Sequence, residues 1–448
     1  MEFNELTAIS AVDGRYRKYC ENLAAYFSEY ALMKYRTLIE VEYFIFLSEK
    51  KMFSISAGTK KILRNAITNF SIDDAMAIKE IEKTTNHDVK AVEYFCKKIL
   101  DESTDAGKKE WIHFGLTSQD INNTAIPLSW KACIVNEFLP KLSGLEQKLH
   151  ALALQWKDVP MLARTHGQPA SPTKLGKEIF VFVERLQHQQ TLFSQIPFTA
   201  KFGGATGNFN AHYAAFPEKN WIGFANDFVS KKLGLQRLQF TTQIDHYDNL
   251  AAQLDNLKRI NTILVDLARD MWAYISMDYF KQAVKKGEIG SSAMPHKVNP
   301  IDFENAEGNL GIANALLEHL SAKLPVSRLQ RDLTDSTVLR NLGVPMAHIL
   351  IAFQSLEKGL GKLLLHEKKM EEDLDNNWAV LAEAIQTILR RENFPGAYEV
   401  LKDLTRGKDQ INKESLHRFI DSLDLKPSVR KELKKLRPGN YSGKNPAY

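Results

Sequence analysis

The stretch that decides the fold is DNLAAQLDNLKRINTILVDLARDMWAYI, which runs from Asp248 to Ile275. Its large apolar residues recur at steps of three or four and so form one stripe along a helix. They are Leu250, Leu254, Leu257, Ile260, Leu264, Leu267, Met271 and Tyr274. Since no proline occurs between Pro217 and Pro295, nothing interrupts the pattern, and we expect one long amphipathic helix here.

Three further segments carry the same spacing. One runs from Pro300 to about Leu324 and another from Met346 to Leu365. The third follows Thr173, with apolar residues at Leu175, Ile179, Phe182, Leu186 and Phe193. Long helices with near-heptad stripes need one another to cover their apolar faces. The sequence therefore predicts an all-α fold built on a long-helix bundle that is shared between subunits.

The remaining segments complete a three-domain division. We expect shorter helices over residues 1–111, the bundle over residues 112–365, and a helical domain rich in lysine and glutamate over residues 366–448. Glycine and proline predict loops at Leu162–Pro172, Phe202–Ala211 and Lys285–Lys297. The best candidate for a short strand is RLQFTTQI, Arg237–Ile244.

Composition narrows the class of protein. The 448 residues suffice for two to four domains of ~100–200 residues, or one long core with smaller ends. With 59 basic and 54 acidic residues interspersed, the net charge of +5 favours a solvated surface over nucleic-acid binding. A local basic pocket for an anionic small molecule stays open.

Targeting and metal signals are lacking. The three cysteines, Cys20, Cys96 and Cys133, are odd in number and widely spaced, which argues against a disulfide framework or a zinc site. None of the 12 histidines has HExxH spacing. The start, MEFNELTAISAVDGRY, has early acids and no apolar segment, and no stretch approaches the ~18 uncharged apolar residues of a membrane helix. We expect a cytoplasmic protein without a membrane segment.

The segment GSSAMPHKVNP, Gly290–Pro300, carries the most chemistry. Ser291 and Ser292 follow a glycine in a short segment rich in hydroxyl groups. Asn299 suits a helix N-cap, and the proline after it suits the first helical position. Lys297 and the serines thus precede a helix N-terminus, which favours anions. Spacing alone would still favour an ordinary loop.

The full segment resembles the signature GSSxMPxKxNP of the fumarase/aspartase superfamily at every fixed position. The blocks around Arg15, His87 and Arg331 narrow the resemblance to the adenylosuccinate lyase family, in its longer bacterial form. The matching blocks are DGRY (Asp13–Tyr16), TTNHDVKAVEYF (Thr84–Phe95), HFGLTSQDINN (His113–Asn123), RTHGQPASPT (Arg164–Thr173), TTQI (Thr241–Ile244), RDLTDSTVLRN (Arg331–Asn341) and PGNYSG (Pro438–Gly443).

This resemblance implies an all-α, three-domain fold with a central long-helix bundle. It also implies a homotetramer in which three subunits contribute to each active site. The implied reaction is a β-elimination that releases fumarate from adenylosuccinate and from the succinylcarboxamide intermediate SAICAR. A base removes a proton beside a succinyl carboxylate, the carbanion is held as an aci-carboxylate, and an acid protonates the departing nitrogen. This chemistry needs no metal or redox cofactor.

The resemblance also implies roles for individual residues. One serine of the loop is the base, Ser291 in preference to Ser292, with Lys297 and the helix N-terminus stabilising its alkoxide. The general acid is His166, since an imidazole exchanges protons near neutral pH. His87 orients His166 or the substrate.

Further residues are implied to contact the substrate. Asp88 would fix the tautomer of His87; the contribution of Asn86 stays open, because some branches of the family carry arginine there. The implied ligands of the succinyl end and its surroundings are Thr117, Ser118, Lys297, Asn299 and Gln243.

The sequence contains neither a P-loop nor a GxGxxG motif that would bind the phosphate of the implied nucleotide substrate. The resemblance instead implies Arg15, Tyr16, Arg331, Ser336 and Arg340, and arginine suits phosphate through its two-pronged donor geometry. By spacing alone, ion pairs of Arg331 and Arg340 with Asp332 and Asp335 would be favoured. The FGGATGN segment offers backbone amides for an anion, although a plain interhelix loop is as good an interpretation.

Three other functions are compatible with parts of the sequence. Argininosuccinate lyase, fumarase, aspartase and a carboxymuconate-type cycloisomerase share the serine loop but differ in the nucleotide-side blocks. A non-catalytic helical scaffold is disfavoured by the intact Ser291, Lys297, His166 and His87. A nucleic-acid binder has only the small basic excess in its favour.

Overall fold

The computed structural model describes residues 4–283, 298–405 and 411–447. Ser291, Ser292 and Lys297 therefore lie outside the described residues, as does the whole of the predicted loop Lys285–Lys297. The described chain is mainly helical, and its strands pair as three two-stranded sheets. It divides into two compact units. Unit 1 comprises Met1–Ser143, Gln189–Thr262 and Gly308–Gln354, and unit 2 comprises Gly144–His188, Ile263–Glu307 and Ser355–Tyr448.

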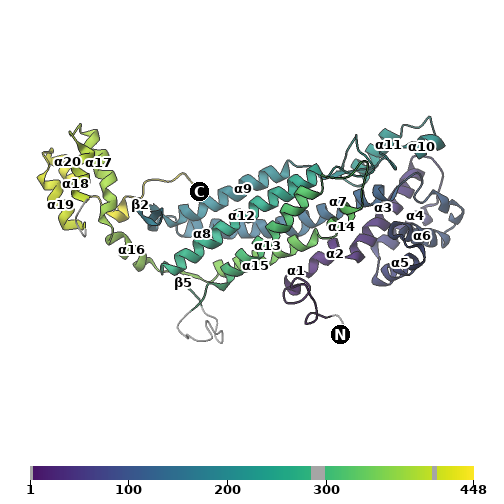
Figure 1. Ribbon diagram of the computed structural model, residues 1–448, viewed down its shortest axis with the longest axis horizontal. Helices are drawn as coiled ribbons and strands as arrows, with labels where there is room; N and C mark the ends of the chain where they lie inside the picture. Colours follow the sequence, from purple (N-terminus) through teal and green to yellow (C-terminus); the bar gives the residue numbers. More distant parts are fainter. Residues whose placement is uncertain (1–3, 284–297, 406–410, 448) are drawn as a thin grey trace. The chain divides into compact units, whose positions relative to one another are not determined.

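The apolar stripes form the long helices that their spacing predicts. Helix α12 spans Asp248–Ser276, α9 spans Leu175–Ser194 and α13 spans Ile301–Lys323 (Figure 1). The stripe of α12 is buried from Leu254 to Met271, and every stripe position of α9 is buried. Burial of the striped face, rather than helix propensity alone, supplies most of the stability of such helices.

The fourth long segment is helical over a shorter range than predicted. Helix α15 spans Gly343–Leu360 instead of continuing to Leu365. Two glycines, Gly359 and Gly361, weaken the helix at its end. The residues beyond form strand β6 (Leu363–Leu365), which pairs antiparallel with β5 (Phe280–Gln282) in unit 2.

Unit 1 begins with helices that surround α3. These are α1 (Arg17–Cys20), α2 (Ala24–Phe27), α3 (Glu29–Glu49), α4 (Ala57–Thr68), α5 (Ile72–Thr85), α6 (Asp88–Asp101) and α7 (Ser118–Cys133). Helix α3 is buried on two sides, because Phe44 and Ile45 pack into one apolar cluster, whereas Tyr43 and Phe46 pack into another. Short helices α10 (Asn210–Ala215), α11 (Trp221–Asp227) and α14 (Thr334–Leu339) complete the unit.

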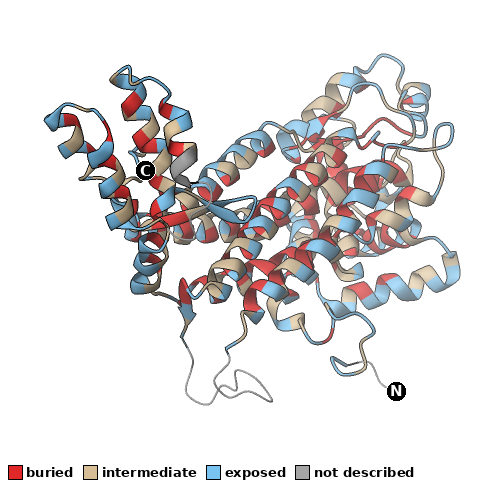
Figure 2. Cartoon of the chain, turned by 60° about the vertical axis from the view of Figure 1, so that its left-hand side comes forward, coloured by how far each residue is buried: buried red, intermediate tan, exposed pale blue. Residues whose placement is uncertain are grey.

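Polar side chains join the long helices where their apolar stripes meet. In unit 1, Asn261 Nδ2 on α12 donates to Asn314 Oδ1 on α13 at 2.9 Å. His348 Nδ1 on α15 lies 2.8 Å from Asn309 Oδ1 on the same helix α13. Buried positions face neighbouring helices throughout (Figure 2). These bonds satisfy polar groups that burial would otherwise penalise.

Unit 2 holds the hairpin and the C-terminal helices. Strands β1 (Pro160–Thr165) and β2 (Gln168–Lys174) follow helix α8 (Leu139–Gln155). The later helices are α16 (Glu367–Asp375), α17 (Ala382–Arg391), α18 (Ala397–Thr405), α19 (Lys413–Ser422) and α20 (Pro427–Leu433). An apolar cluster that includes Leu381, Ile385 and Ile420 forms their core.

Short 3₁₀ and π segments occur in both units. They are η1 (Glu21–Leu23), η2 (Ala106–Trp111), η3 (Ile134–Phe138), η4 (Phe228–Lys232), η5 (Trp378–Leu381) and η6 (Pro438–Asn440).

The strand predicted at Arg237–Ile244 is much shorter in the structure. Only β4 (Gln236–Arg237) is extended, and it pairs in parallel with β3 (Thr199–Ala200). An alternating pattern of polar and apolar side chains forms a strand only where a neighbouring strand is available to pair with it. Strand β3 offers only two residues, and the side chain of the next residue, Lys201, bonds to Asp120.

One described stretch, Thr334–Leu360, is long and apolar enough to cross a membrane by length and composition. It comprises two helices, α14 and α15, and 61% of its most apolar window is buried inside the structure. The core helix of a globular protein has the same properties.

The fully buried carboxylate of Asp120 attaches the segment Phe202–Asn208, the glycine loop, to helix α7. Asp120 Oδ1 accepts hydrogen bonds from Lys201 Nζ at 2.7 Å and from the backbone N–H of Gly203 at 2.8 Å. The backbone N–H of Gly204 lies 3.1 Å from both carboxylate oxygens. The side chains of Asp120 and Lys201 are both 0% exposed. The predicted loop Phe202–Ala211 is thus confirmed as a loop up to Phe209, and two of its amides bind an anion that belongs to the protein itself.

A histidine packs beneath the chain that leads into α7. His212 is fully buried, and a Cβ atom on Gly115 would lie 2.8 Å from its ring. Tyr43 Oη donates to Phe114 O at 2.8 Å and lies 3.1 Å from His212 Nε2, so this nitrogen carries the hydrogen. Nδ1 of the same ring is buried without a hydrogen-bond partner among the described residues. Burial lowers the pKa of His212 to about 4.

Substitution of Lys201 by methionine is expected to destabilise the protein by about 3–5 kcal/mol, because Asp120 would keep a buried charge without its partner. Urea unfolding followed by circular dichroism measures this loss. Lys83→Met is the matched control, since Lys83 pairs with Glu80 in an ion pair whose side chains are 73% and 72% exposed. Equal unfolding midpoints for the two variants would contradict the importance of the buried pair.

The low pKa of His212 predicts a loss of stability in mild acid. The unfolded chain protonates this imidazole below its ordinary pKa of 6.5, whereas the folded chain resists protonation until about 4. Its contribution is therefore complete above pH 6.5 and declines as the pH falls toward 4. His212→Gln should weaken the fall in the unfolding midpoint between about pH 7 and pH 5. The control His319→Gln, at an exposed position of α13, should leave that fall unchanged; an equal effect of both variants would disprove the assignment.

Candidate active site

His166 lies at the tip of a β-hairpin, where the sequence predicted a loop. Strands β1 and β2 pair antiparallel, with Thr165 opposite Gln168. His166 and Gly167 form the two-residue turn, with φ values of +53° and +75°. Positive φ at both central positions is typical of a type I′ turn, which matches the twist of the paired strands. Histidine tolerates this left-handed conformation better than most residues do.

The hairpin is anchored within unit 2. Arg164 Nη2 donates to Asp373 Oδ2 on α16 at 2.9 Å, and Tyr279 Oη donates to the same oxygen at 2.5 Å. Ser171 donates to Glu383. These contacts hold both strands, while His166 itself stays exposed at the tip. A side chain in this position is rigidly supported yet accessible to a ligand.

Asn299 also belongs to unit 2 and precedes α13. The sequence predicted it as the N-cap of that helix. The backbone N–H of Glu304 instead bonds to Pro300 O at 3.3 Å, so the cap lies one residue later. The remaining described candidates belong to unit 1.

His87 caps the start of α6 and faces Ser118. Its Nδ1 accepts the backbone N–H of Lys90 at 3.1 Å, so the hydrogen of the neutral ring lies on Nε2. Nε2 is 3.5 Å from Ser118 Oγ. Asp88 was expected to fix this tautomer, but its nearest carboxylate oxygen lies 3.9 Å from Nδ1. The main-chain amide at the helix start performs that task instead.

Asp88 joins two arginines from other helices. Its Oδ2 accepts from Arg36 Nη2 at 2.8 Å and from Arg340 Nη2 at 3.3 Å. Burial alone would raise the pKa of Asp88, but the charge of Arg36 and its hydrogen bond outweigh burial and lower it. Asp88 is therefore a structural anion at the centre of this cluster.

Arg36 is a residue that the sequence analysis did not select. Its side chain is buried, and its Nε donates to Asn122 Oδ1 at 2.9 Å. The available signal was a lone arginine on the apolar face of α3. Without a partner in view, such a residue is indistinguishable from one that reaches solvent.

Asn86 has a conformational role. It ends α5 with φ +47°, and its backbone N–H bonds to Glu82 O at 2.8 Å. Asparagine, along with glycine, is the residue best suited to this left-handed position after a helix. The turn it makes directs the next residue, His87, into the cluster.

Thr117 and Ser118 form the N-terminus of α7. The backbone N–H of Thr117 donates to Asp120 Oδ2 at 2.9 Å, which ties this end to the buried carboxylate. Ser118 is the first helical residue and lies opposite His87. The N-terminus of this 16-residue helix favours a negative group.

Arg331, Ser336 and Arg340 meet around α14. Arg331 Nη2 donates to Ser336 Oγ at 3.1 Å, and Arg340 Nη1 donates to Ser336 O at 3.1 Å. Arg331 Nη1 is also 3.4 Å from Gln243 Oε1. The spacing R-x4-S-x3-R therefore brings its three members into contact, and Gln243 joins them.

The alternative ion pairs are present in part. Arg331 Nε lies 3.7 Å from Asp335 Oδ1. Arg340 pairs with Glu29 at 3.0 Å and with Asp88, rather than with the nearby acids of its own segment. Ion pairing and anion binding are compatible here, because each guanidinium has five N–H donors.

Arg15 and Tyr16 precede α1 in unit 1. Arg15 is exposed, and its guanidinium lies 5.9 Å from the centre of the Tyr16 ring. Gly14 packs against Glu5 and Ala8, so closely that a Cβ would lie 2.6 Å from Glu5 O. This glycine shapes the turn that presents the two residues.

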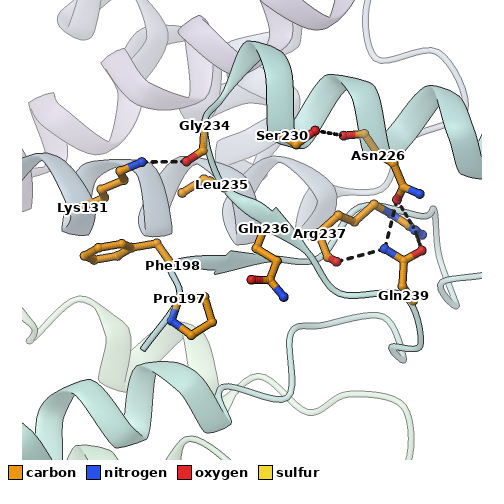
Figure 3. A pocket seen from close by; sticks show the side chains of 10 residues that line it. All are labelled: Lys131, Pro197, Phe198, Asn226, Ser230, Gly234, Leu235, Gln236, Arg237 and Gln239. Atoms are coloured by element: carbon orange, nitrogen blue, oxygen red, sulfur yellow. Dashed lines mark hydrogen bonds between the residues drawn. The ribbon is translucent and has the colours of Figure 1, made fainter. Parts of the chain in front are cut away.

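Unit 1 contains several hollows. One of about 580 Å³ is lined by Lys131, Pro197, Phe198, Asn226, Ser230, Gly234, Leu235, Gln236, Arg237 and Gln239 (Figure 3). Its two cations bond to backbone carbonyls, Lys131 to Gly234 O and Arg237 to Phe202 O. None of the candidates lines it among the described residues. A cavity of about 170 Å³ instead borders Arg36, Asn122, Ser336 and Arg340, next to the Asp88 cluster.

Comparisons with known proteins identify the family of the chain. A family model described as "Lyase" matches residues 14–313, and one described as "Adenylosuccinate lyase C-terminal" matches residues 327–442. An adenylosuccinate lyase of Dictyostelium discoideum is 56% identical, over 99% of this chain and 98% of the relative. One of Escherichia coli strain K12 is 48% identical with the same coverage.

Solved structures share the fold. A fumarate lyase from Mesorhizobium sp. BNC1 has a TM-score of 0.76 at 17% identity, covering 94% of this chain and 95% of that one. A 3-carboxy-cis,cis-muconate lactonizing enzyme from Pseudomonas putida has a TM-score of 0.73 at 19% identity, with the same coverage. The all-α fumarase/aspartase-like fold is confirmed, and identity over nearly the whole length shows that this chain belongs to the adenylosuccinate lyase family.

Proposed function

We propose that this protein releases fumarate from adenylosuccinate to give AMP, and from SAICAR to give AICAR, in purine nucleotide biosynthesis. The observation that carries the proposal is 56% identity over almost the full length of a curated adenylosuccinate lyase. The intact serine loop GSSAMPHKVNP supports a catalytic protein over a helical scaffold. The same identity favours this lyase over the other members of the superfamily.

The elimination needs a base and an acid on opposite sides of the breaking bond. Ser291 is the proposed base, in preference to Ser292, and Lys297 stabilises its alkoxide. His166 is the proposed acid. Its place at the tip of an anchored hairpin supports this role, because an exposed imidazole on a rigid turn can reach a bound ligand. The proton from carbon goes to the serine, and the departing nitrogen receives its proton from His166.

The succinyl carboxylates need fixed donors. Thr117 and Ser118 supply them at the start of α7, where the helix N-terminus also favours anions. His87 has its Nε2–H directed at Ser118 and so can donate to a ligand held there. Asn299 and Lys297 complete the succinyl end, and Gln243 adds a contact.

The phosphate is proposed to bind among Arg331, Ser336 and Arg340, with Arg15 and Tyr16 added from the N-terminal segment. The mutual contacts of the first three support this role, because they already form one cluster of donors. Asn86 and Asp88 shape the adjoining wall, through the turn into His87 and the two arginines that Asp88 binds.

The proposed assembly is a cytoplasmic homotetramer with active sites shared between subunits and with three helical domains. Large apolar residues stay exposed on the long helices, among them Leu192 (46%), Trp272 (45%) and Ile312 (51%). Exposed apolar side chains on helices of this length are suited to packing against other subunits.

The purified protein should convert adenylosuccinate to AMP and fumarate without added metal, followed by ultraviolet absorbance. Absence of turnover of both succinyl substrates in a folded protein would disprove the proposed function.

His166→Ala and Ser291→Ala should each lower kcat by about 10²–10⁴-fold, because each removes a proton-transfer group. Nucleotide binding, measured by calorimetry, should persist. Ser292→Ala is the matched control and should retain most of the activity; a normal kcat in Ser291→Ala would refute its role.

Mixing the two inactive variants should restore part of the activity. In a shared site, some assemblies contain an intact His166 and an intact Ser291 at the same centre. The variants are mixed under conditions that exchange subunits, and recovery is compared with each variant treated alone. Full exchange, shown by mass spectrometry, with no recovered activity would argue against shared sites.

A further inference from the structure

Behind Arg331 lies a chain of buried hydrogen bonds that the elimination chemistry does not use. Tyr247 Oη donates to Asp335 Oδ2 at 3.0 Å and accepts from Asn123 Nδ2 at 2.8 Å. The other oxygen of Asp335, Oδ1, lies 3.7 Å from Arg331 Nε. Asn123, Tyr247 and Asp335 are all buried. The chain thus runs from α7 through the start of α12 to α14, and ends on a proposed phosphate ligand.

The direction of each hydrogen bond is determined by its neighbours. Asn123 Oδ1 accepts the backbone N–H of Asp245 at 2.9 Å, so the amide nitrogen of Asn123 must point at Tyr247. The phenol then accepts from Asn123 and has its own hydrogen free for Asp335. Burial raises the pKa of Tyr247 well above its ordinary value, so that hydrogen is retained.

The backbone at Tyr247 is held against its preference. Its φ is +59°, a left-handed conformation that is unfavourable for a residue other than glycine. The backbone N–H of Tyr247 donates to Asp245 Oδ1 at 2.6 Å, which stabilises the turn. This conformation places the phenol between α7 and α14. A buried tyrosine kept in such a turn is over-determined by its surroundings, as is common near functional sites.

The far end of the chain leaves one charged contact incomplete. Arg331 Nε and Asp335 Oδ1 are both buried without a hydrogen-bond partner among the described residues, and they face each other. Because Tyr247 holds Oδ2, the carboxylate of Asp335 cannot rotate freely to grip the guanidinium with both oxygens. Arg331 is therefore oriented by Asp335 through Nε, while its two Nη groups point to Ser336 and Gln243. Those Nη groups are the donors that an anion would meet.

We propose that Asn123, Tyr247 and Asp335 are positioning residues that orient Arg331 toward the phosphate of the substrate. They set the affinity for the phosphorylated nucleotide rather than the rate of elimination. The inference rests on the proposed function. It gives one physical reason why the blocks HFGLTSQDINN, TTQI with its continuation to Tyr247, and RDLTDSTVLRN meet in the fold.

The test is Tyr247→Phe, which keeps the ring and removes only the hydroxyl group. The KM for adenylosuccinate should rise about tenfold, the usual scale for loss of a hydrogen bond to a charged group, while kcat changes less than about threefold. Tyr30→Phe is the matched control. It removes another hydrogen-bonded phenol in unit 1, which donates to Phe70 O at 2.6 Å, and it should leave KM unchanged.

A purely structural role is separated by the phosphate-free nucleoside of the substrate. On that compound, Tyr247→Phe and the unsubstituted protein should have kcat/KM values within about twofold of each other, because Arg331 has no phosphate to bind. Arg331→Lys and Tyr247→Phe should also be non-additive on the nucleotide, since both act through one guanidinium. A full tenfold effect on the nucleoside, or additivity of the two changes, would overturn the proposal.

Asp335→Asn provides a second variant in case Tyr247→Phe folds poorly. It keeps an acceptor for Tyr247 but removes the charge that faces Arg331, so AMP binding measured by calorimetry should weaken by about tenfold. Unchanged AMP affinity in a folded Asp335→Asn protein would refute the role. Failure of the unsubstituted protein to turn over adenylosuccinate would instead contradict the proposed function, so the two failures are distinguishable.

Discussion

The carboxylate of Asp120 connects parts of unit 1 that are far apart in the sequence. It holds Lys201 and the amides of Gly203 and Gly204 on one side, and it accepts the backbone N–H of Thr117 on the other. A charge buried this completely is tolerated only when each lone pair has a donor. The position of the α7 N-terminus, and with it Ser118 opposite His87, therefore depends on the same carboxylate that closes the glycine loop. The anion-binding amides foreseen in that loop are real, but their anion is internal.

The long helices could be predicted because their pattern repeats over many turns. The stripe from Leu254 to Met271 indicates a helix at nearly every step, and α12 ends within one residue of the expected boundary. Short elements gave no such redundancy. The hairpin around His166 contains prolines and polar residues that are equally at home in a loop, and Leu363–Leu365 reads as the end of a helix until β5 is seen beside it. Strand pairing with a distant partner is invisible to local periodicity.

Candidate residues could be selected from sequence blocks, whereas their partners could not. The blocks do not reveal that Asp88 binds Arg36 and Arg340, or that a main-chain amide fixes the tautomer of His87. The two contacts of Asp88 join residues separated by 52 and 252 positions, so nothing in local spacing reports them. Asn86 differs from these residues, because its role depends on the local backbone and not on a distant partner. Its left-handed turn explains the asparagine from backbone geometry alone, without a contact to the substrate.

If Arg340 binds the substrate phosphate as proposed, its ion pairs affect how tightly the nucleotide is held. This arginine is shared between Glu29 and Asp88, and about half of its side chain is open to solvent. A phosphate that recruits it competes with two carboxylates already in place, so the measured affinity is the difference between two sets of ion pairs. Asp88 loses little in the exchange, because Arg36 stays bound to it. Arg340 can therefore exchange a carboxylate partner for a phosphate while Asp88 stays paired with Arg36. No buried charge loses its partner in either direction, so the exchange favours release of the ligand as well as its binding.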